Sequence, residues 1–110
     1  MKFFETIFLK DAEEFISSLD VKTVKKIIYN IDLAEQTNDP RLLKKLSNGI
    51  WEFRSNFSGK QIRLLAFWDK RDNKKTLVVA THGFIKKSNK IPANEIEKAL
   101  RIKKEYFNEL

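Results

Sequence analysis

Two arginines in this 110-residue sequence have the type and spacing needed for chemistry on a phosphate group. Arg54 and Arg63 fall in two segments that alternate polar and apolar residues, and alternation places both on one side of paired strands. A guanidinium holds two phosphate oxygens at once and stays charged at any working pH. The pair therefore predicts a phosphate-binding site, although two ordinary surface arginines neutralised by Glu52 or other carboxylates would give the same pattern.

His82 is the only histidine of the chain, and it precedes a segment that holds Lys86, Lys87 and Lys90. An imidazole exchanges a proton near neutral pH, and neighbouring cations favour a polyanionic substrate, so this segment predicts acid–base chemistry. Two alternatives remain open. A single histidine often has a structural role, and runs of lysine often only keep a surface hydrated.

The distribution of charge points to the same part of the chain. Residues 1–40 contain 5 Lys and Arg against 8 Asp and Glu, a net charge of −3, whereas residues 41–110 contain 17 against 7, a net charge of +10. The later part is where a polyanion would bind. Charge alone does not choose between RNA, DNA and an acidic protein.

Several classes of site have no support in the sequence. There is no cysteine, no pair of histidines at metal spacing and no glycine-rich phosphate loop, and the acidic residues are scattered. We therefore expect neither a metal nor a cofactor. No apolar run approaches the roughly 20 residues that span a bilayer, and the N-terminus lacks the core of a signal peptide, so we expect a cytoplasmic protein without membrane association.

The local patterns predict one α+β domain over residues 1–110, with the element order βααβββα and an antiparallel sheet packed against helices. Turn signals at 47–49, 58–59 and 69–73 separate the later strands. The predicted strands cover residues 2–10, 50–56, 61–68 and 76–84.

Three helices are expected around this sheet. Asp11 and Glu14 form an N-terminal signature for the first, and Asp20 can cap the second, which ends near residues 38–40. Pro92 can lie in the first turn of the last helix, which continues through Phe107. The apolar stripe of that helix would cover the sheet or, alternatively, bind a partner.

Taken together, five segments of this sequence resemble the RelE/ParE toxin superfamily, and most closely its phage-derived, HigB-like branch. The resemblance covers nearly the whole chain, and the order of the segments is more specific than any one of them. The segments are Leu46-Ser47-Asn48-Gly49-Ile50-Trp51-Glu52-Phe53-Arg54, Ile62-Arg63-Leu64-Leu65-Ala66-Phe67-Trp68, His82-Gly83-Phe84-Ile85-Lys86-Lys87, Ile91-Pro92 and Glu95-Ile96.

This resemblance implies a RelE-like, microbial RNase-type fold with helices on one side of a sheet, whose open face cleaves mRNA in the ribosomal A site. It also implies the toxin of a type II toxin–antitoxin system, inhibited by an antitoxin that the adjacent gene encodes. Glu52 departs from the members closest to RelE, which have lysine there. By motif position the candidate catalytic residues are Arg54, Arg63, His82, Lys86 and Lys87, and the candidate RNA-binding residues are Glu52, Lys60 and Lys90.

The implied reaction is metal-independent attack of a ribose 2′-OH on the adjacent phosphate, which gives a 2′,3′-cyclic phosphate and a 5′-OH end. The basic residues would stabilise the charge that develops, His82 would act as general acid or base, and Glu52 is a weaker candidate for the other role. Two other functions stay open: a ParE-like inhibitor of DNA gyrase and a non-catalytic basic RNA-binding domain.

Overall fold

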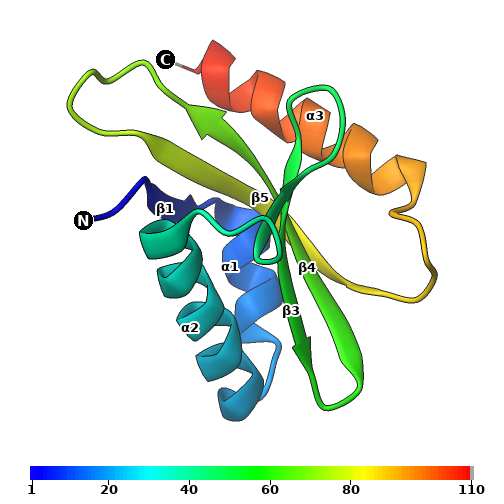
Figure 1. Cartoon of the computed structure of the whole chain (residues 1–110). Helices are drawn as coiled ribbons and strands as arrows, with labels where there is room; N and C mark the ends of the chain where they lie inside the picture. The colour runs from blue at the N-terminus through cyan, green and yellow to red at the C-terminus, as the bar shows by residue number, and fades with distance from the viewer. Residues whose placement is uncertain (110) are drawn as a thin grey trace.

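The computed structural model describes residues 1–109 and contains a five-stranded sheet, with two helices on one face and one helix on the other (Figure 1). The predicted α+β class is correct, and one strand is added to the predicted order. The elements are β1 (Glu5–Phe8), α1 (Lys10–Ser17), α2 (Val21–Thr37), β2 (Leu43–Lys45), β3 (Trp51–Phe57), β4 (Lys60–Asp69), β5 (Leu77–Lys86) and α3 (Ala93–Asn108).

The sheet is mixed, so the prediction of a purely antiparallel sheet was wrong. Its strands are ordered β1-β5-β4-β3-β2, and β1 runs parallel to β5 at one edge while the other pairs are antiparallel. The strand β2 at the other edge was missed, because Leu43, Lys44 and Lys45 are too few to show an alternating pattern.

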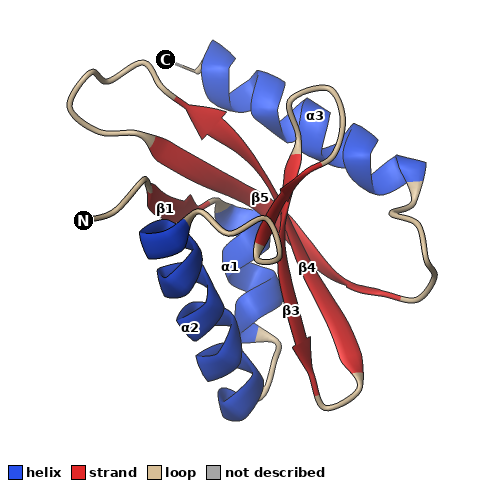
Figure 2. Ribbon diagram, viewed as in Figure 1, coloured by secondary structure: helices blue, strands red, loops and turns tan. Residues whose placement is uncertain are grey.

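Helices cover both faces of the sheet, whereas the resemblance implied helices on one side only (Figure 2). Apolar residues of β3, β4 and β5 such as Phe53 and Leu64 pack under α1 and α2. On the opposite face Leu65, Phe67 and Val79 pack under Ala99 of α3. The apolar stripe of α3 therefore covers the sheet, which leaves only the part of that face beyond the helix for binding.

The ends of α2 lie where the sequence predicts them. The side chain of Asp20 accepts a hydrogen bond from the Thr23 backbone N–H (3.3 Å), and Asn38 ends the helix in the left-handed conformation with φ of 53°. For α1 the predicted cap was wrong: Leu9 precedes the helix, and Asp11 lies inside its first turn. There the Asp11 carboxylate interacts favourably with the positive end of the helix dipole but makes no capping hydrogen bond.

The β3–β4 hairpin fixes the register of the candidate arginines. Ser58 and Gly59 have φ of 52° and 74°, which is the conformation of a two-residue turn whose twist matches that of the strands. The turn makes Phe57 and Lys60 the first pair of the hairpin, and Arg54 and Arg63 are then the fourth pair.

A β-bulge at Thr81 interrupts the β4–β5 ladder. Ala66 pairs with Ala80 and Leu65 pairs with His82, so Thr81 has no partner of its own. Without this extra residue, alternation would direct His82 to the same face as Ala80, under α1 and α2. The bulge instead turns His82 to the face that α3 covers.

No helix formed by residues 1–109 is long and apolar enough to cross a membrane.

Gly83 allows α1 to approach β5 closely. A Cβ atom at this position would lie 2.2 Å from Phe15 and 2.8 Å from Leu64. We expect Gly83→Ala to lower the free energy of unfolding by about 1–3 kcal/mol, because the added methyl group forces α1 outward. Urea unfolding measures this, and an unchanged midpoint would show that the α1–β5 contact is looser than described.

Candidate functional site

Three charged residues form a cluster on the face of the sheet that α3 partly covers. Arg54 of β3 lies directly opposite Arg63 of β4, as the alternation predicts. Glu52, two residues before Arg54, contacts both guanidiniums: its carboxylate oxygens lie 3.5 Å from Arg54 Nε and 3.8 Å from Arg63 Nε. The cluster therefore has two positive charges and one negative charge.

Arg63 is buried, contrary to the expectation of an open face that exposes both arginines. Its side chain is 1% exposed, and its guanidinium donates to Asn56 Oδ1 (3.2 Å), to Gln61 Oε1 (3.3 Å) and to the carbonyl of Ile62 (2.9 Å). Burial lowers the pKa of Arg63, and the Glu52 carboxylate opposes that shift. Arg63 thus holds other residues in place and does not itself reach a ligand in this conformation.

Arg54 is the arginine of the pair that remains accessible, with 35% of its side chain exposed. It borders a groove of about 470 Å³ between α2 and the edge of β3. Lys26, Tyr29 and Arg41 also line this groove, and Tyr29 is largely exposed. Asp39 lines the groove too and pairs with Arg41 (2.7 Å), so a phosphate would meet Arg54 and Lys26 here, with an aromatic ring beside them.

Glu52 is positioned to hold the arginines and not to accept a proton from a substrate. Its side chain is 4% exposed and lies between the two cations. A carboxylate beside two guanidiniums relieves the repulsion that Arg54 and Arg63 would otherwise exert on each other. Glutamate in place of lysine at position 52 therefore allows the two arginines to lie side by side.

His82 is also buried, with 2% of its surface exposed. Its Nε2 atom lies 3.1 Å from Glu95 Oε1 on the first turn of α3, and its Nδ1 atom lies 2.9 Å from the Thr81 hydroxyl. Burial lowers the pKa of the imidazole; the hydrogen bond to Glu95 opposes this, and the charge of Lys98 adds to it. A neutral ring satisfies both contacts when Nε2–H donates to Glu95 and the Thr81 hydroxyl donates to Nδ1 in place of the Leu65 carbonyl, which lies 3.3 Å from the hydroxyl oxygen.

The predicted basic residues do not all gather around Arg54 and Arg63. Lys86 pairs with Gln61 at the end of β5 and so shares the face of Arg63, and Lys87 follows it and is exposed. Lys90 is exposed in the connection to α3. Lys60 pairs with Phe57, whose ring packs under α1 and α2, so alternation places Lys60 on the opposite face.

Residues 14–104 match the family described as phage-derived Gp49-like protein (DUF891). The chain belongs to this Gp49-like family. The match spans most of the chain, including the arginine cluster and the His82-Gly83-Phe84 segment, and the family is toxin-like and related to RelE. A comparison with curated proteins gave no match.

Sequence reasoning missed four residues that complete the site of this Gp49-like protein. Asn56 and Gln61 hold the Arg63 guanidinium, and Thr81 and Glu95 hold the His82 ring. Asn56 and Gln61 could have been found, because they flank the predicted turn and share the face of Arg63. Glu95 could not, since nothing local places α3 over His82. Within residues 1–109 no group of acidic and histidine side chains is arranged to bind a metal ion.

We expect Glu52→Gln to lower the free energy of unfolding by about 3 kcal/mol, because it leaves the buried Arg63 cation without its counter-charge. The double variant Glu52→Gln/Arg63→Met should lose less than the sum of the two single changes. Urea unfolding of all four proteins measures the coupling. Additive losses would show that Glu52 and Arg63 do not stabilise each other.

The lowered pKa of His82 predicts a dependence of stability on pH. The folded protein keeps the ring neutral while the unfolded chain protonates near pH 6.5, so the free energy of unfolding should fall as the pH drops below about 6.5. The slope cannot exceed about 1.4 kcal/mol per pH unit for one group. His82→Gln should flatten this region between pH 5 and 7 in urea unfolding, and an unaltered slope would assign it to other groups.

Proposed function

We propose that this protein is the toxin of a type II toxin–antitoxin pair and an endoribonuclease that cleaves mRNA on the ribosome. The observation that supports this most is the cluster of Arg54, Arg63 and Glu52 on the sheet face, in a chain of a toxin-like family. The proposal includes that the protein belongs to a HigB-like branch of such toxins.

In the proposed reaction a ribose 2′-OH attacks the adjacent phosphorus, the P–O5′ bond breaks, and the products are a 2′,3′-cyclic phosphate and a 5′-OH. Arg54 would contact the phosphate oxygens, with Lys86 and Lys87 adding positive charge at the same end of the sheet. Arg63 and Glu52 would fix the direction of the Arg54 side chain. His82 would act as a positioning residue through Glu95.

The burial of His82 supports the ribosome dependence. On the arginine-bearing face Arg54 and Lys86 are partly exposed, whereas the His82 imidazole is enclosed by Thr81 and Glu95. A site of this kind supplies electrostatic stabilisation but aligns no proton acceptor with the 2′-OH. We propose that the ribosome holds the RNA with its 2′-OH and leaving oxygen in line, so that cations are sufficient.

An antitoxin is the proposed protein partner, because the family is toxin-like. An acidic segment of that partner would lie against the accessible face around Arg54 and would be steered there by charge.

The test is mRNA cleavage in a purified translation system, mapped at the new 5′ ends. Arg54→Ala should lower the cleavage rate by about 10²–10³-fold, because one cation leaves the developing charge, and Arg54→Lys should recover part of it. Arg101→Ala on α3 is the matched control, since Arg101 is exposed and forms no ion pair with residues 1–109. Cleavage should also require ribosomes.

Equal cleavage by Arg54→Ala and wild type would overturn the assigned role of Arg54. The same preparations are assayed for inhibition of gyrase-dependent supercoiling. Intact mRNA together with inhibited supercoiling would replace the nuclease by a gyrase inhibitor.

A further inference from the structure

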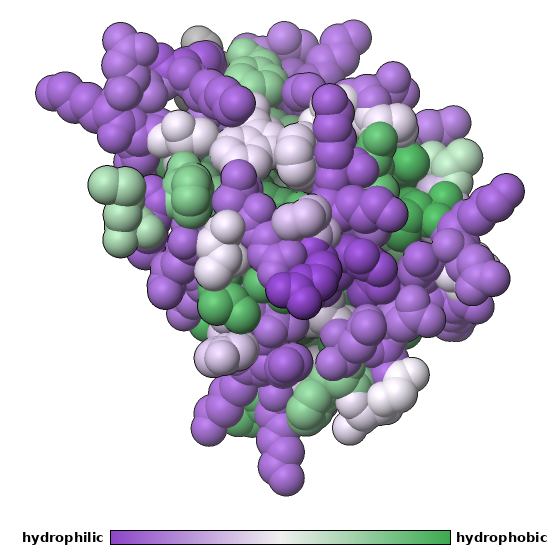
Figure 3. All heavy atoms as spheres, in the orientation of Figure 1, coloured by the Kyte–Doolittle hydropathy of each residue, from purple (hydrophilic) through white to green (hydrophobic). Residues whose placement is uncertain are grey.

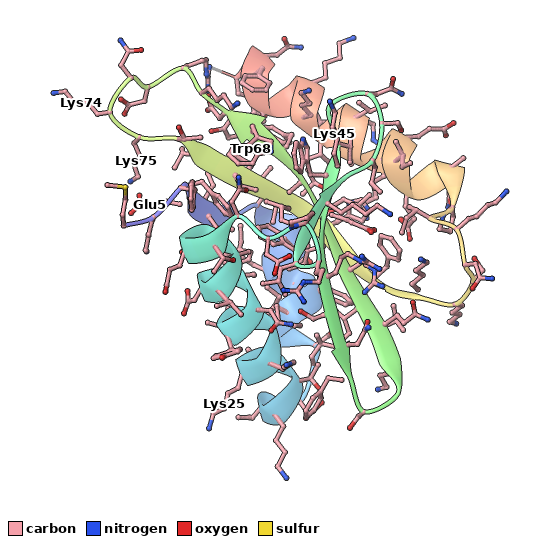
Figure 4. All side chains as sticks on the ribbon, viewed as in Figure 1. Glu5, Lys25, Lys45, Trp68, Lys74 and Lys75 are labelled. Carbon is pink, nitrogen blue, oxygen red and sulfur yellow. The ribbon has the colours of Figure 1, made fainter. Side chains whose placement is uncertain are left out.

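A second basic hollow lies away from the arginine cluster, where β2, the start of β3, the end of β4 and α3 meet. Its volume is about 420 Å³, and it is lined by Lys45, Lys70, Lys103 and two tryptophans, Trp51 and Trp68. Figure 4 shows Lys45 and Trp68 near the upper end of the sheet and Lys25 at the opposite end of α2.

The two tryptophans of this hollow are half-buried and belong to the sheet face under α1 and α2. Their rings meet edge to face with centroids 5.5 Å apart. Helix α2 ends at Thr37, and Asn38 borders the hollow, so this corner of the face lies past the end of the helix. Indole surface is thus left in the wall of an open hollow.

The lysines of the hollow lack acidic partners. None of Lys45, Lys70 and Lys103 forms an ion pair within residues 1–109, and no carboxylate lines the hollow. Lys45 pairs with Trp51 across the β2–β3 ladder, and Lys70 Nζ lies 5.1 Å from the centre of the Trp68 ring.

The turn between β2 and β3 allows the third lysine to reach this place. Gly49 has φ of 78°, and a Cβ atom there would lie 2.8 Å from Lys103 Nζ. The Lys103 ammonium group therefore lies in the space that a side chain at residue 49 would occupy. Three cations and two indoles from four separate elements converge in one hollow.

We propose that this hollow binds a nucleotide of single-stranded RNA, with the base against the tryptophans and the phosphate among the lysines. Aromatic faces combined with unpaired cations are the two components of sequence-tolerant binding to single strands. An acidic peptide would use the lysines but gain little from two indole faces. The inference extends the proposed function, because RNA is the substrate class in both, but it assigns a separate contact that does not depend on cleavage.

Trp51 and Trp68 are the only tryptophans in the chain, so fluorescence excited at the red edge of the tryptophan band, where Tyr29 and Tyr106 do not absorb, reports from this hollow. The probe is a 2′-O-methyl oligonucleotide, which binds as RNA does but has no 2′-OH to attack. Titration should quench the fluorescence and should saturate. An abasic oligonucleotide of equal length should quench far less, because it keeps the phosphates and lacks the bases.

The double variant Lys45→Gln/Lys70→Gln should weaken binding about tenfold or more. It should also lower the slope of log K against log salt by about 1.4, since each phosphate contact on a single strand contributes about 0.7. The matched control is Lys25→Gln/Lys74→Gln, which removes the same charge at two exposed lysines that do not line the hollow (Figure 4). It should leave affinity and quenching within about twofold, and far-ultraviolet circular dichroism checks that both variants are folded.

Three results would overturn the proposal: equal weakening in both double variants, binding seen by anisotropy without quenching, or quenching by polyglutamate but not by the oligonucleotide. Arg54→Ala separates this proposal from the nuclease proposal. If that variant loses cleavage and keeps the quenching, both proposals stand. If the wild type quenches but never cleaves, only the nuclease proposal fails.

Discussion

A guanidinium that is cut off from water must find a counter-charge and hydrogen-bond acceptors within the fold, and Arg63 imposes this condition on the middle of the sheet. Glu52 supplies the charge, and Asn56 and Gln61 supply acceptors from the two strands of one hairpin. These contacts require the register that the Ser58–Gly59 turn sets. With Arg63 so held, Arg54 is the member of the pair left at the surface, beside the groove along α2.

The same face is divided by α3. From the pair Leu65–His82 toward the end of the sheet where residues 70–76 connect β4 to β5, apolar packing under the helix excludes a ligand. The arginine pair and Lys86 lie on the other side of the Leu65–His82 pair, past the first turn of α3. The bulge at Thr81 makes this division stable, because it turns His82 toward Glu95 and so ties the beginning of α3 to β5. The structure thus combines a covered half that stabilises the fold with a basic half suited to a polyanion.

Figure 3 shows hydrophilic side chains over much of the visible surface, with apolar patches between them.

Local patterns predicted the parts of this arrangement that depend on local interactions. Alternation along β3 and β4, with a glycine-containing turn between them, was enough to bring Arg54 and Arg63 together, and Asp20 was enough to begin α2. The burial of Arg63 could not be predicted, since it depends on how the side chains of Glu52, Asn56 and Gln61 close around the guanidinium. The bulge at Thr81 changes the side of the sheet that His82 faces. The extra residue itself is neither a glycine nor a proline, so the sequence does not indicate the bulge. The parallel pairing of β1 with β5 is likewise set by packing between distant segments.

Arg63 is a buried cation that positions its neighbours, and we propose that Arg54 is the arginine that contacts RNA. The Nε atoms of both arginines are buried, so the two roles are distinguished by nuclear magnetic resonance of their guanidinium Nη–H groups, with a non-cleavable 2′-O-methyl oligonucleotide added. We expect slow solvent exchange and unchanged resonances for Arg63, and a clear shift for Arg54 as the oligonucleotide binds. A shift of Arg63 with fast exchange, while Arg54 stays unchanged, would contradict it.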